Sequence, residues 1–264
     1  MAPHNPPMTL HVHEFGPADG RPVVFLHGLT GHGGRWRLLA ERELADFRVL
    51  APDLRGHGYS TQLPPWTLDQ NADDVLDMLD SLGLDRVPLV GHSYGGATAM
   101  HVTARAPERI EKLALLDPST GLAPQRCFDI AVEECEPELW PSLDAARADI
   151  AEMWSAMPVE AIDLELSANF EQRLDGQWQR RYLPAMAVSA WSQMSRQPVL
   201  PPRGTRTLLL PATKADFVAP ELVAALRDRL GADLTVREVD SGHVLYLEQP
   251  AEVGALLREF LCQA

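Results

Sequence analysis

The sequence contains few residues of several kinds, and each scarcity excludes a class of protein. Lysine and arginine total 23 against 37 aspartates and glutamates, a formal charge of -14 that would repel phosphate backbones and anionic lipid surfaces. No run of roughly 18 apolar residues occurs, and residues 1–7 have neither the basic nor the apolar region of a signal peptide. We therefore expect no nucleic-acid partner, no membrane partner and a cytoplasmic location.

Cysteines are also scarce, and no metal pattern is evident. Cys127, Cys135 and Cys262 cannot all pair, and their spacing matches no zinc site, which favours reduced structural thiols. His11 and His13 would share one face of a strand, a spacing that is compatible with metal binding. Because no third ligand lies nearby in the sequence, we expect surface histidines, no metal and no cofactor.

What the chain of 264 residues does contain is an alternation of strand and helix patterns. A weakly alternating edge strand is expected over residues 8–15, and Thr67 or Asp69 could cap a helix whose aspartates form a solvated face. The alternation predicts an α/β fold with a doubly wound, mostly parallel sheet, in which ligands lie at the carboxyl ends of the strands. Its buried strands are expected at residues 23–26, 48–51, 87–90, 112–117, 205–210 and 234–239.

The alternation breaks in the middle of the chain, where helices are expected at residues 143–157, 158–170 and 182–194. We interpret residues 122–202 as an inserted helical cap, and residues 1–121 with 203–264 as the core domain. Bulky apolar residues in this segment indicate a partly apolar cavity, although for any single residue packing within the cap is the alternative. The tryptophans expected to line a substrate pocket are Trp36, Trp140, Trp154 and Trp191.

A glycine-rich turn, Gly91-His-Ser93-Tyr-Gly95, lies between a predicted buried strand and a predicted helix. A sharp turn there would present the Ser93 hydroxyl at the carboxyl end of the strand, and the glycines would remove colliding Cβ atoms. The alternative is a connection that only allows close packing.

A serine hydroxyl needs a neutral imidazole to accept its proton, and the imidazole needs a carboxylate to orient it. Ser93, Asp216 and His243 each follow a predicted strand, so they are expected at one edge of the sheet. Asp117 also follows a strand and is the alternative carboxylate. His57, which lies between two glycines, is interpreted as structural rather than as an acid or base.

These motifs and their order resemble the α/β-hydrolase fold family over nearly the whole chain. The resemblance implies Ser93 as nucleophile, His243 as general base, and an oxyanion hole formed by the backbone N–H groups of Leu29 and Tyr94. It favours Asp216 as the orienting carboxylate, since that residue lies in the matching loop. The matching segments are His27-Gly28, Asp53-Leu-Arg-Gly-His-Gly58-Tyr-Ser60, the turn at Ser93, Asp216-Phe-Val-Ala-Pro220, and Ser241-Gly-His243 with Glu248-Gln-Pro250.

The predicted function is that of a serine hydrolase that cleaves carboxylic esters of small to medium, partly apolar substrates through an acyl-enzyme on Ser93. Carbon–carbon bond hydrolase, thioesterase, lactonase and perhydrolase chemistry use the same triad and stay open. From a different class, a non-catalytic ligand receptor on the same fold is the alternative. The expected binding partner is a small ester-like substrate molecule. The sequence is also compatible with a homodimer.

Overall fold

A computed structural model describes residues 10–263 of the chain. Residues 1–9 and 264 lie outside the described residues. The outer part of the expected edge strand, residues 8–9, and the N-terminal stretch for which we expect no signal peptide therefore also lie outside them. The fold contains a seven-stranded sheet in the order β1-β3-β2-β4-β5-β8-β9, in which only β1 is antiparallel to its neighbour. The strands are β1 (Val12–Phe15), β2 (Arg21–Leu26), β3 (Phe47–Pro52), β4 (Val87–His92), β5 (Ile110–Leu116), β8 (Thr207–Leu210) and β9 (Leu234–Val236). The predicted doubly wound sheet is therefore confirmed.

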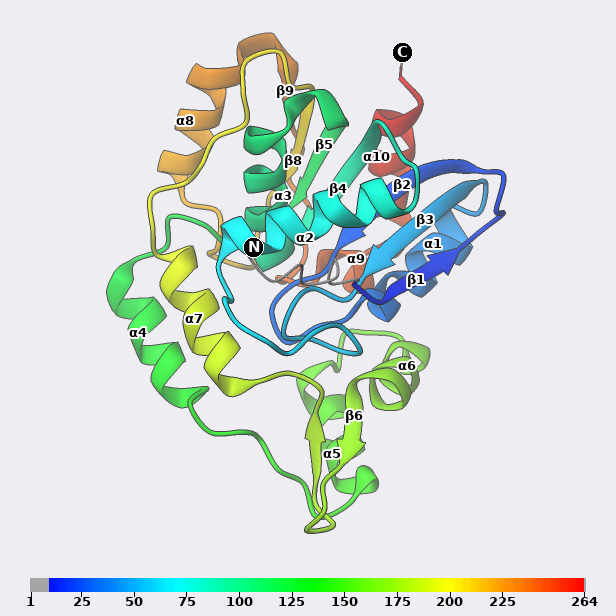
Figure 1. Ribbon diagram of the computed structural model, residues 1–264, viewed down its shortest axis with the longest axis vertical. Coiled ribbons are helices and arrows are strands. Elements are labelled where there is room, and N and C mark those ends of the chain that lie inside the picture. Colours follow the sequence, from blue (N-terminus) through cyan, green and yellow to red (C-terminus); the bar gives the residue numbers. More distant parts are fainter. Residues whose placement is uncertain (1–9, 264) are drawn as a thin grey trace, which may run out of the picture.

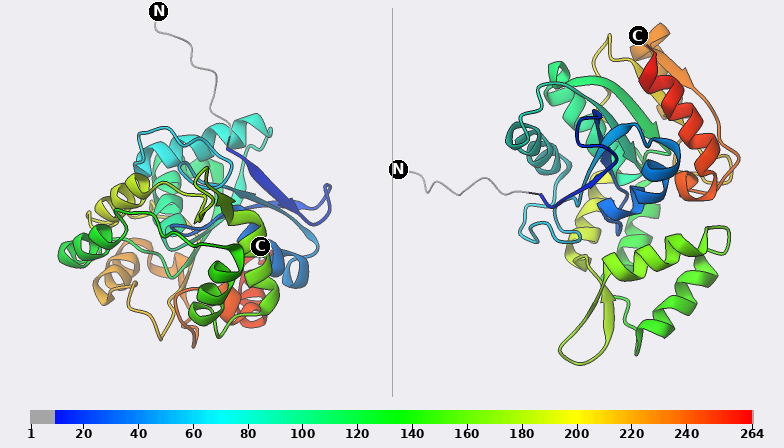
Figure 2. Two further views of the ribbon diagram at one scale, coloured as in Figure 1. Left: turned by 90° about the horizontal axis from the view of Figure 1, so that it is seen from below. Right: turned by 90° about the vertical axis from the view of Figure 1, so that its right-hand side faces the viewer.

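Helices cover both faces of this sheet (Figures 1 and 2). Successive residues of β2 point to opposite faces, so that Val23 and Phe25 join one apolar core and Val24 and Leu26 the other. This alternation explains why residues 23–26 of the strand are all apolar. The first core packs against α1 (Arg37–Glu43), α9 (Leu245–Glu248) and α10 (Pro250–Cys262), and the second against α2 (Leu68–Ser81), α3 (Tyr94–Arg105) and α8 (Pro220–Leu230).

Of the two residues predicted to cap helix α2, Thr67 and Asp69, Thr67 is the one that does so. Thr67 precedes the helix, and its side-chain oxygen accepts a hydrogen bond from the Gln70 backbone N–H at 3.1 Å. The expectation that all aspartates of α2 are solvated is wrong for Asp74. Its carboxylate is buried and accepts two hydrogen bonds of 2.6 Å from Arg55, because the guanidinium replaces the water that the carboxylate loses.

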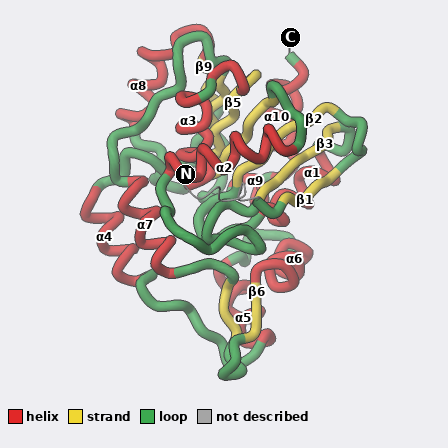
Figure 3. The backbone as a smooth tube through the Cα atoms, in the orientation of Figure 1, coloured by secondary structure: helices red, strands yellow, loops and turns green. Residues whose placement is uncertain are grey.

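The segment between β5 and β8 lies below the carboxyl ends of the strands, and loops connect it to the sheet (Figures 1 and 3). It contains the three expected helices, α5 (Leu143–Met153), α6 (Val159–Asn169) and α7 (Pro184–Met194), and also α4 (Pro124–Glu133). A short hairpin of β6 (Phe170–Gln172) and β7 (Trp178–Arg180) was not predicted, because its strands are short and largely polar. The division into core and cap domains stays a prediction.

Two expectations based on scarce residues can be compared with the described part of the chain. Cys127, Cys135 and Cys262 are all unpaired, and only Cys127 is buried. Between residues 10 and 263 we find no helix that combines the length and the apolar character needed to cross a bilayer.

Candidate active site

Ser93 occupies the turn between β4 and α3 in a strained backbone conformation, with φ of 55° and ψ of -121°. The glycines on either side make this turn possible. A Cβ atom on Gly91 would lie 2.4 Å from the Gly95 carbonyl oxygen, and one on Gly95 would lie 2.4 Å from the Leu26 carbonyl oxygen. The predicted sharp turn is therefore present. Close backbone packing at Gly91 and Gly95 keeps Ser93 in its strained conformation.

Three side chains from distant parts of the sequence form one hydrogen-bonded chain. The Ser93 Oγ atom lies 2.8 Å from Nε2 of His243, and Nδ1 of His243 lies 2.6 Å from Oδ2 of Asp117. Asp117 is fully buried, and its Oδ1 accepts a hydrogen bond of 3.0 Å from the Ala212 backbone N–H. An ionised carboxylate placed there fixes the imidazole with Nε2 free to accept the serine proton.

The predicted carboxylate, Asp216, does not belong to this hydrogen-bonded series of side chains, so its assignment as the partner of His243 is wrong. Its side chain is 83% exposed and pairs with Arg126, whose Nη2 lies 2.7 Å from Oδ1 of Asp216. Strand order explains the difference. Asp117 directly follows β5, the neighbour of β4, whereas Asp216 lies in the loop after β8, one strand farther from Ser93.

The loop that carries Asp216 still reaches the imidazole through the next residue. The Phe217 ring stacks on the His243 ring with 3.8 Å between centroids, and the Arg126 guanidinium carbon lies 4.4 Å from the Phe217 ring centroid. The matching loop therefore supports His243 by an aromatic contact rather than by a charge.

Two polar residues near the triad were not singled out from the sequence. Ser119 Oγ lies 3.1 Å from Ser93 Oγ, and the Ser119 backbone N–H donates to the Ser93 carbonyl oxygen at 3.1 Å. The His92 Nε2–H donates to the His243 carbonyl oxygen at 2.8 Å and so holds the loop that carries the His243 imidazole. Burial lowers the pKa of His92 well below its ordinary value, so its ring stays neutral. The position of His92 inside the Ser93 turn is the one sequence signal that could have indicated it.

His27 and His57 connect two loops beside the site. The His27 Nε2 atom accepts from the Leu54 backbone N–H at 2.9 Å, and the His57 Nε2 atom accepts from the Thr30 backbone N–H at 3.2 Å. Desolvation lowers the pKa of His57 to about 4, which keeps the ring neutral. All four ring nitrogens form hydrogen bonds with backbone groups, which agrees with the structural interpretation of His57. These bonds also hold the loop that contains Leu29.

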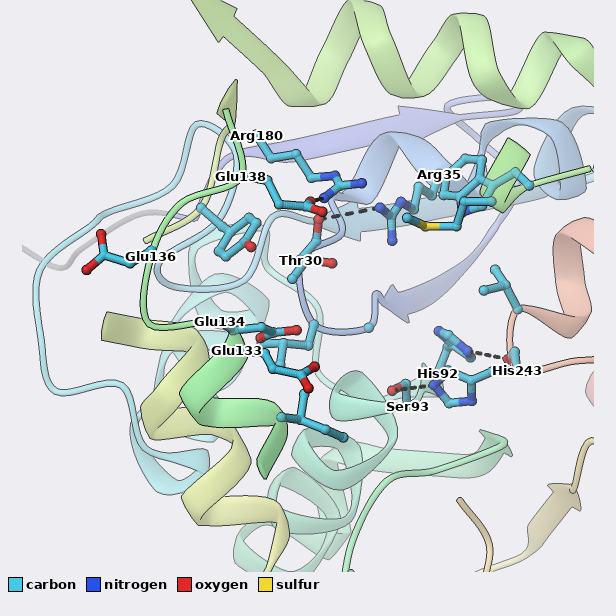
Figure 4. Close-up of a pocket in the computed structure, with 17 residues that line it drawn as sticks. Thr30, Arg35, His92, Ser93, Glu133, Glu134, Glu136, Glu138, Arg180 and His243 are labelled. Atoms are coloured by element: carbon cyan, nitrogen blue, oxygen red, sulfur yellow. Dashed lines mark hydrogen bonds and ion pairs between the residues drawn. The ribbon is translucent and has the colours of Figure 1, made fainter. Parts of the chain in front are cut away.

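A cavity of about 400 Å³ opens above Ser93 and His243, and Figure 4 shows its lining. Of the four tryptophans predicted to line it, only Trp154 does so. Trp36 is fully buried in the first apolar core, where it stacks on Tyr246, and Trp140 packs on Phe170. The Trp191 ring lies on α7 with its Nε1–H bound to Glu134 Oε2 at 2.8 Å. These three were predicted from residue type, which does not distinguish packing from a cavity wall.

The cavity is lined by more charge than the sequence predicted. Arg35 binds the buried carboxylate of Glu165 with two hydrogen bonds, at 2.7 and 2.6 Å, and Arg180 pairs with Glu138. Glu133 lines the cavity too, and within residues 10–263 neither lysine nor arginine forms an ion pair with it. In Figure 4 the carboxylates of Glu133, the last residue of α4, and of Glu134, which follows it, project toward the space beside Ser93, whereas that of Glu136 points away. Both cavity arginines are neutralised by carboxylates, so Glu133 leaves the site with an excess of negative charge.

Comparison with known proteins agrees with this architecture. The sequence model of the α/β-hydrolase family matches residues 23–256. The chain belongs to this family. Lipase LipV of Mycobacterium tuberculosis is 38% identical over 258 residues, which cover 96% of this chain and 98% of the lipase. Esterase YbfF of Escherichia coli is 27% identical over 92% of this chain and 94% of the esterase.

Solved structures show the same fold. An E-2-(acetamidomethylene)succinate hydrolase superposes with a TM-score of 0.85 at 21% identity, covering 97% of this chain and 96% of that enzyme. The enol-lactonase of Burkholderia xenovorans superposes with a TM-score of 0.74 at 21% identity, covering 96% of each chain. These matches confirm the fold, and the lipase and esterase relatives confirm the prediction of a hydrolase that acts on esters.

Proposed function

We propose that this protein is a serine hydrolase of carboxylic esters that acts through an acyl-enzyme on Ser93. The observation that supports this most is the unbroken hydrogen-bonded chain from the Ser93 hydroxyl through His243 to the buried Asp117, at 2.8 and 2.6 Å. A chain of this kind at the base of a cavity is the arrangement that activates a serine hydroxyl. The lipase and esterase relatives support ester bonds as the bonds that are cleaved.

In the first half of the proposed reaction, Ser93 Oγ attacks the ester carbonyl carbon while its proton passes to Nε2 of His243. The resulting oxyanion would be bound by the backbone N–H groups of Leu29 and Tyr94. Leu29 lines the cavity beside Ser93, and Tyr94 is the first residue of α3, whose N–H has no acceptor within the helix. The imidazolium then protonates the departing alcohol as the carbon–oxygen bond breaks, which leaves the acyl group on Ser93.

In the second half, water replaces the alcohol. His243 accepts a proton from the water as its oxygen attacks the acyl carbon, and the imidazolium returns that proton to Ser93 Oγ as the acid leaves. Asp117 accepts the Nδ1–H bond of His243 and stabilises the imidazolium, while its bond to the Ala212 N–H holds the carboxylate in place. No other group is needed to balance the two steps.

The cavity lining narrows the proposed substrate class. Its apolar walls include Leu29, Ile130 and Val244, which suit an apolar acyl or alcohol group, while Glu133 and Glu134 would repel an anionic one. We therefore propose small to medium esters that are neutral or cationic. One structural neighbour is named for a succinate derivative, which carries carboxylates. We therefore do not propose that this protein shares the substrate of that neighbour, although the two share a fold.

Active-site labelling tests the assignment directly. A fluorophosphonate incubated with the protein is expected to add one phosphonyl group to Ser93, detected by intact mass and peptide mapping. Ser93→Ala, which removes only the nucleophile, should gain no mass. A correctly folded wild-type protein that stays unlabelled would support the ligand-receptor alternative instead.

Lactone and thioester hydrolysis need a separate comparison, since the same triad performs both. An enol-lactonase and a thioesterase domain are among the proteins of similar fold. A panel of nitrophenyl esters graded by acyl length, with lactones and acyl thioesters beside them, would rank the substrate classes by kcat/KM. Ser93→Ala supplies the background rate for each compound.

A further inference from the structure

A second cluster of chemically active side chains lies away from the cavity, at the antiparallel edge of the sheet. The ligand atoms of His11, His13 and Asp53 all lie within 4.8 Å of one another. From the sequence, the two histidines lacked a third ligand. The structure supplies one because β1 pairs with β3, with Val12 opposite Pro52, and Asp53 follows directly.

The distance within this cluster suits a shared metal ion. Nε2 of His13 lies 3.0 Å from Oδ1 of Asp53. Two ligand atoms that each lie about 2.0–2.1 Å from a tetrahedral zinc ion are separated by roughly 3.3 Å. A small tilt of the His13 ring would therefore let both atoms bind one ion in place of their mutual hydrogen bond.

Surrounding hydrogen bonds already orient the carboxylate. Oδ1 of Asp53 accepts from the Gly33 backbone N–H at 2.8 Å, and Oδ2 accepts from the Tyr59 backbone N–H at 3.0 Å. Such bonds fix a ligand before the metal arrives. The Asp53 side chain is fully buried, so the ion would be held at the boundary between the interior and the solvent.

The third ligand, His11, has a fixed backbone and an available ring. Its backbone N–H donates to Ser60 Oγ at 2.9 Å, and its carbonyl oxygen accepts from the Asp53 backbone N–H at 2.8 Å. Over residues 10–263 its ring makes only edge contacts, with the rings of His13 and Tyr59, and accepts no hydrogen bond. Because His11 is exposed, rotation about its side-chain bonds is enough to bring a ring nitrogen to the ion.

We propose that His11, His13 and Asp53 bind one divalent transition-metal ion, with Zn²⁺ the best match to two imidazoles and a carboxylate. Water would fill the fourth position. The ion takes no part in the hydrolysis proposed for Ser93. It joins β1, the end of β3 and the loop at Gly33, and so stabilises the folded chain.

Calorimetric titration of the chelator-treated full chain with ZnCl₂ tests this site. We expect one equivalent to bind, with at least a tenfold loss of affinity in His11→Ala and in His13→Ala. His101→Ala is the matched control, since it removes a histidine that also lies 3.0 Å from an aspartate but belongs to no such three-residue cluster among the described residues. A His243→Ala variant should keep the full stoichiometry, which separates this site from the triad.

Thermal unfolding provides a second readout. At a Zn²⁺ concentration that saturates the wild type, the Tm of the wild type and of His101→Ala should rise, because a ligand that binds only the folded state stabilises it, and the Tm of His11→Ala should rise clearly less. Cobalt(II) should give the visible absorption of a site with nitrogen and oxygen ligands. Absence of Zn²⁺ binding in the wild type, or binding by His11→Ala and His13→Ala that is as tight as that of the wild type, would overturn the proposal.

Discussion

At the scale of single residues, the decisive feature is which carboxylate meets the imidazole of His243. Asp117 is buried and bonded to both His243 and the Ala212 N–H, whereas Asp216 is exposed and bonded to Arg126. Asp117 also has a φ of 43°, a strained value for a residue other than glycine. The surrounding fold therefore holds this residue in a conformation that it would not adopt on its own.

Substitution of the two aspartates separates their roles. Asp117→Asn should lower kcat/KM for a nitrophenyl ester by about 10³-fold or more, because an amide can force the imidazole into the wrong tautomer. Asp216→Asn should change it by less than about threefold, as expected for an exposed ion pair. Steady-state kinetics at fixed pH measure both, with circular dichroism as the folding control. A larger loss in Asp216→Asn than in Asp117→Asn would reverse the assignment.

At the scale of elements, helix α4 and the loop after it bring negative charge to the cavity. Glu133 lines the cavity without an ion-pair partner among the described residues, while Glu134 is bound to Trp191. Burial raises the pKa of Glu134, because loss of solvent disfavours the charged form of this carboxyl group. The electrostatic character of the cavity thus comes from this one segment rather than from the sheet.

Removal of the Glu133 charge should change substrate preference. In Glu133→Gln we expect kcat/KM to rise up to about fivefold for an ester that carries a carboxylate, since a like-charge interaction near water is worth ~1 kcal/mol. The value for a neutral ester of the same length should stay unchanged. Glu152→Gln, on the exposed side of α5, is the matched control. Equal kcat/KM values of Glu133→Gln and Glu152→Gln for the anionic ester would show that the Glu133 charge does not affect substrate preference.

At the scale of the whole molecule, buried neutral histidines couple stability to pH. Desolvation lowers the pKa of His57 to about 4, and it also lowers those of His27 and His92. An unfolded chain binds protons at these histidines at pH values where the folded chain does not. The free energy of unfolding should therefore fall as the pH decreases from about 6.5, the unfolded value, toward 4.

Denaturant unfolding at a series of pH values measures this dependence. The His57 shift from about 6.5 to about 4 corresponds to about 3 kcal/mol if fully expressed. His57→Gln should lower stability at pH 7 and flatten its slope between pH 6.5 and 4. His101→Gln, which removes a histidine on α3 that pairs with Asp69, should keep the wild-type slope. An equally steep slope in His57→Gln would assign the acid sensitivity to other groups.

Patterns that repeat over a few residues were enough to predict much of this protein. The apolar strand 23–26, the amphipathic helix that begins near Thr67 and the glycine-flanked turn at Ser93 all depend on neighbours in the sequence, so the sequence alone predicted them correctly. It left the cap of that helix open between Thr67 and Asp69. The β6–β7 hairpin was missed, because three-residue polar strands carry no such pattern.

Contacts between distant segments were decided only by the tertiary structure. Both Asp117 and Asp216 follow a strand, and the family resemblance favoured the wrong one. The strand order, which places β5 beside β4, is not written in any local pattern that could have corrected it. The same reason applies to Asp53, which joins His11 and His13 only through the pairing of β1 with β3. Local periodicity reports which residues are buried, but the partner that each buried or charged group meets depends on how the whole chain is arranged.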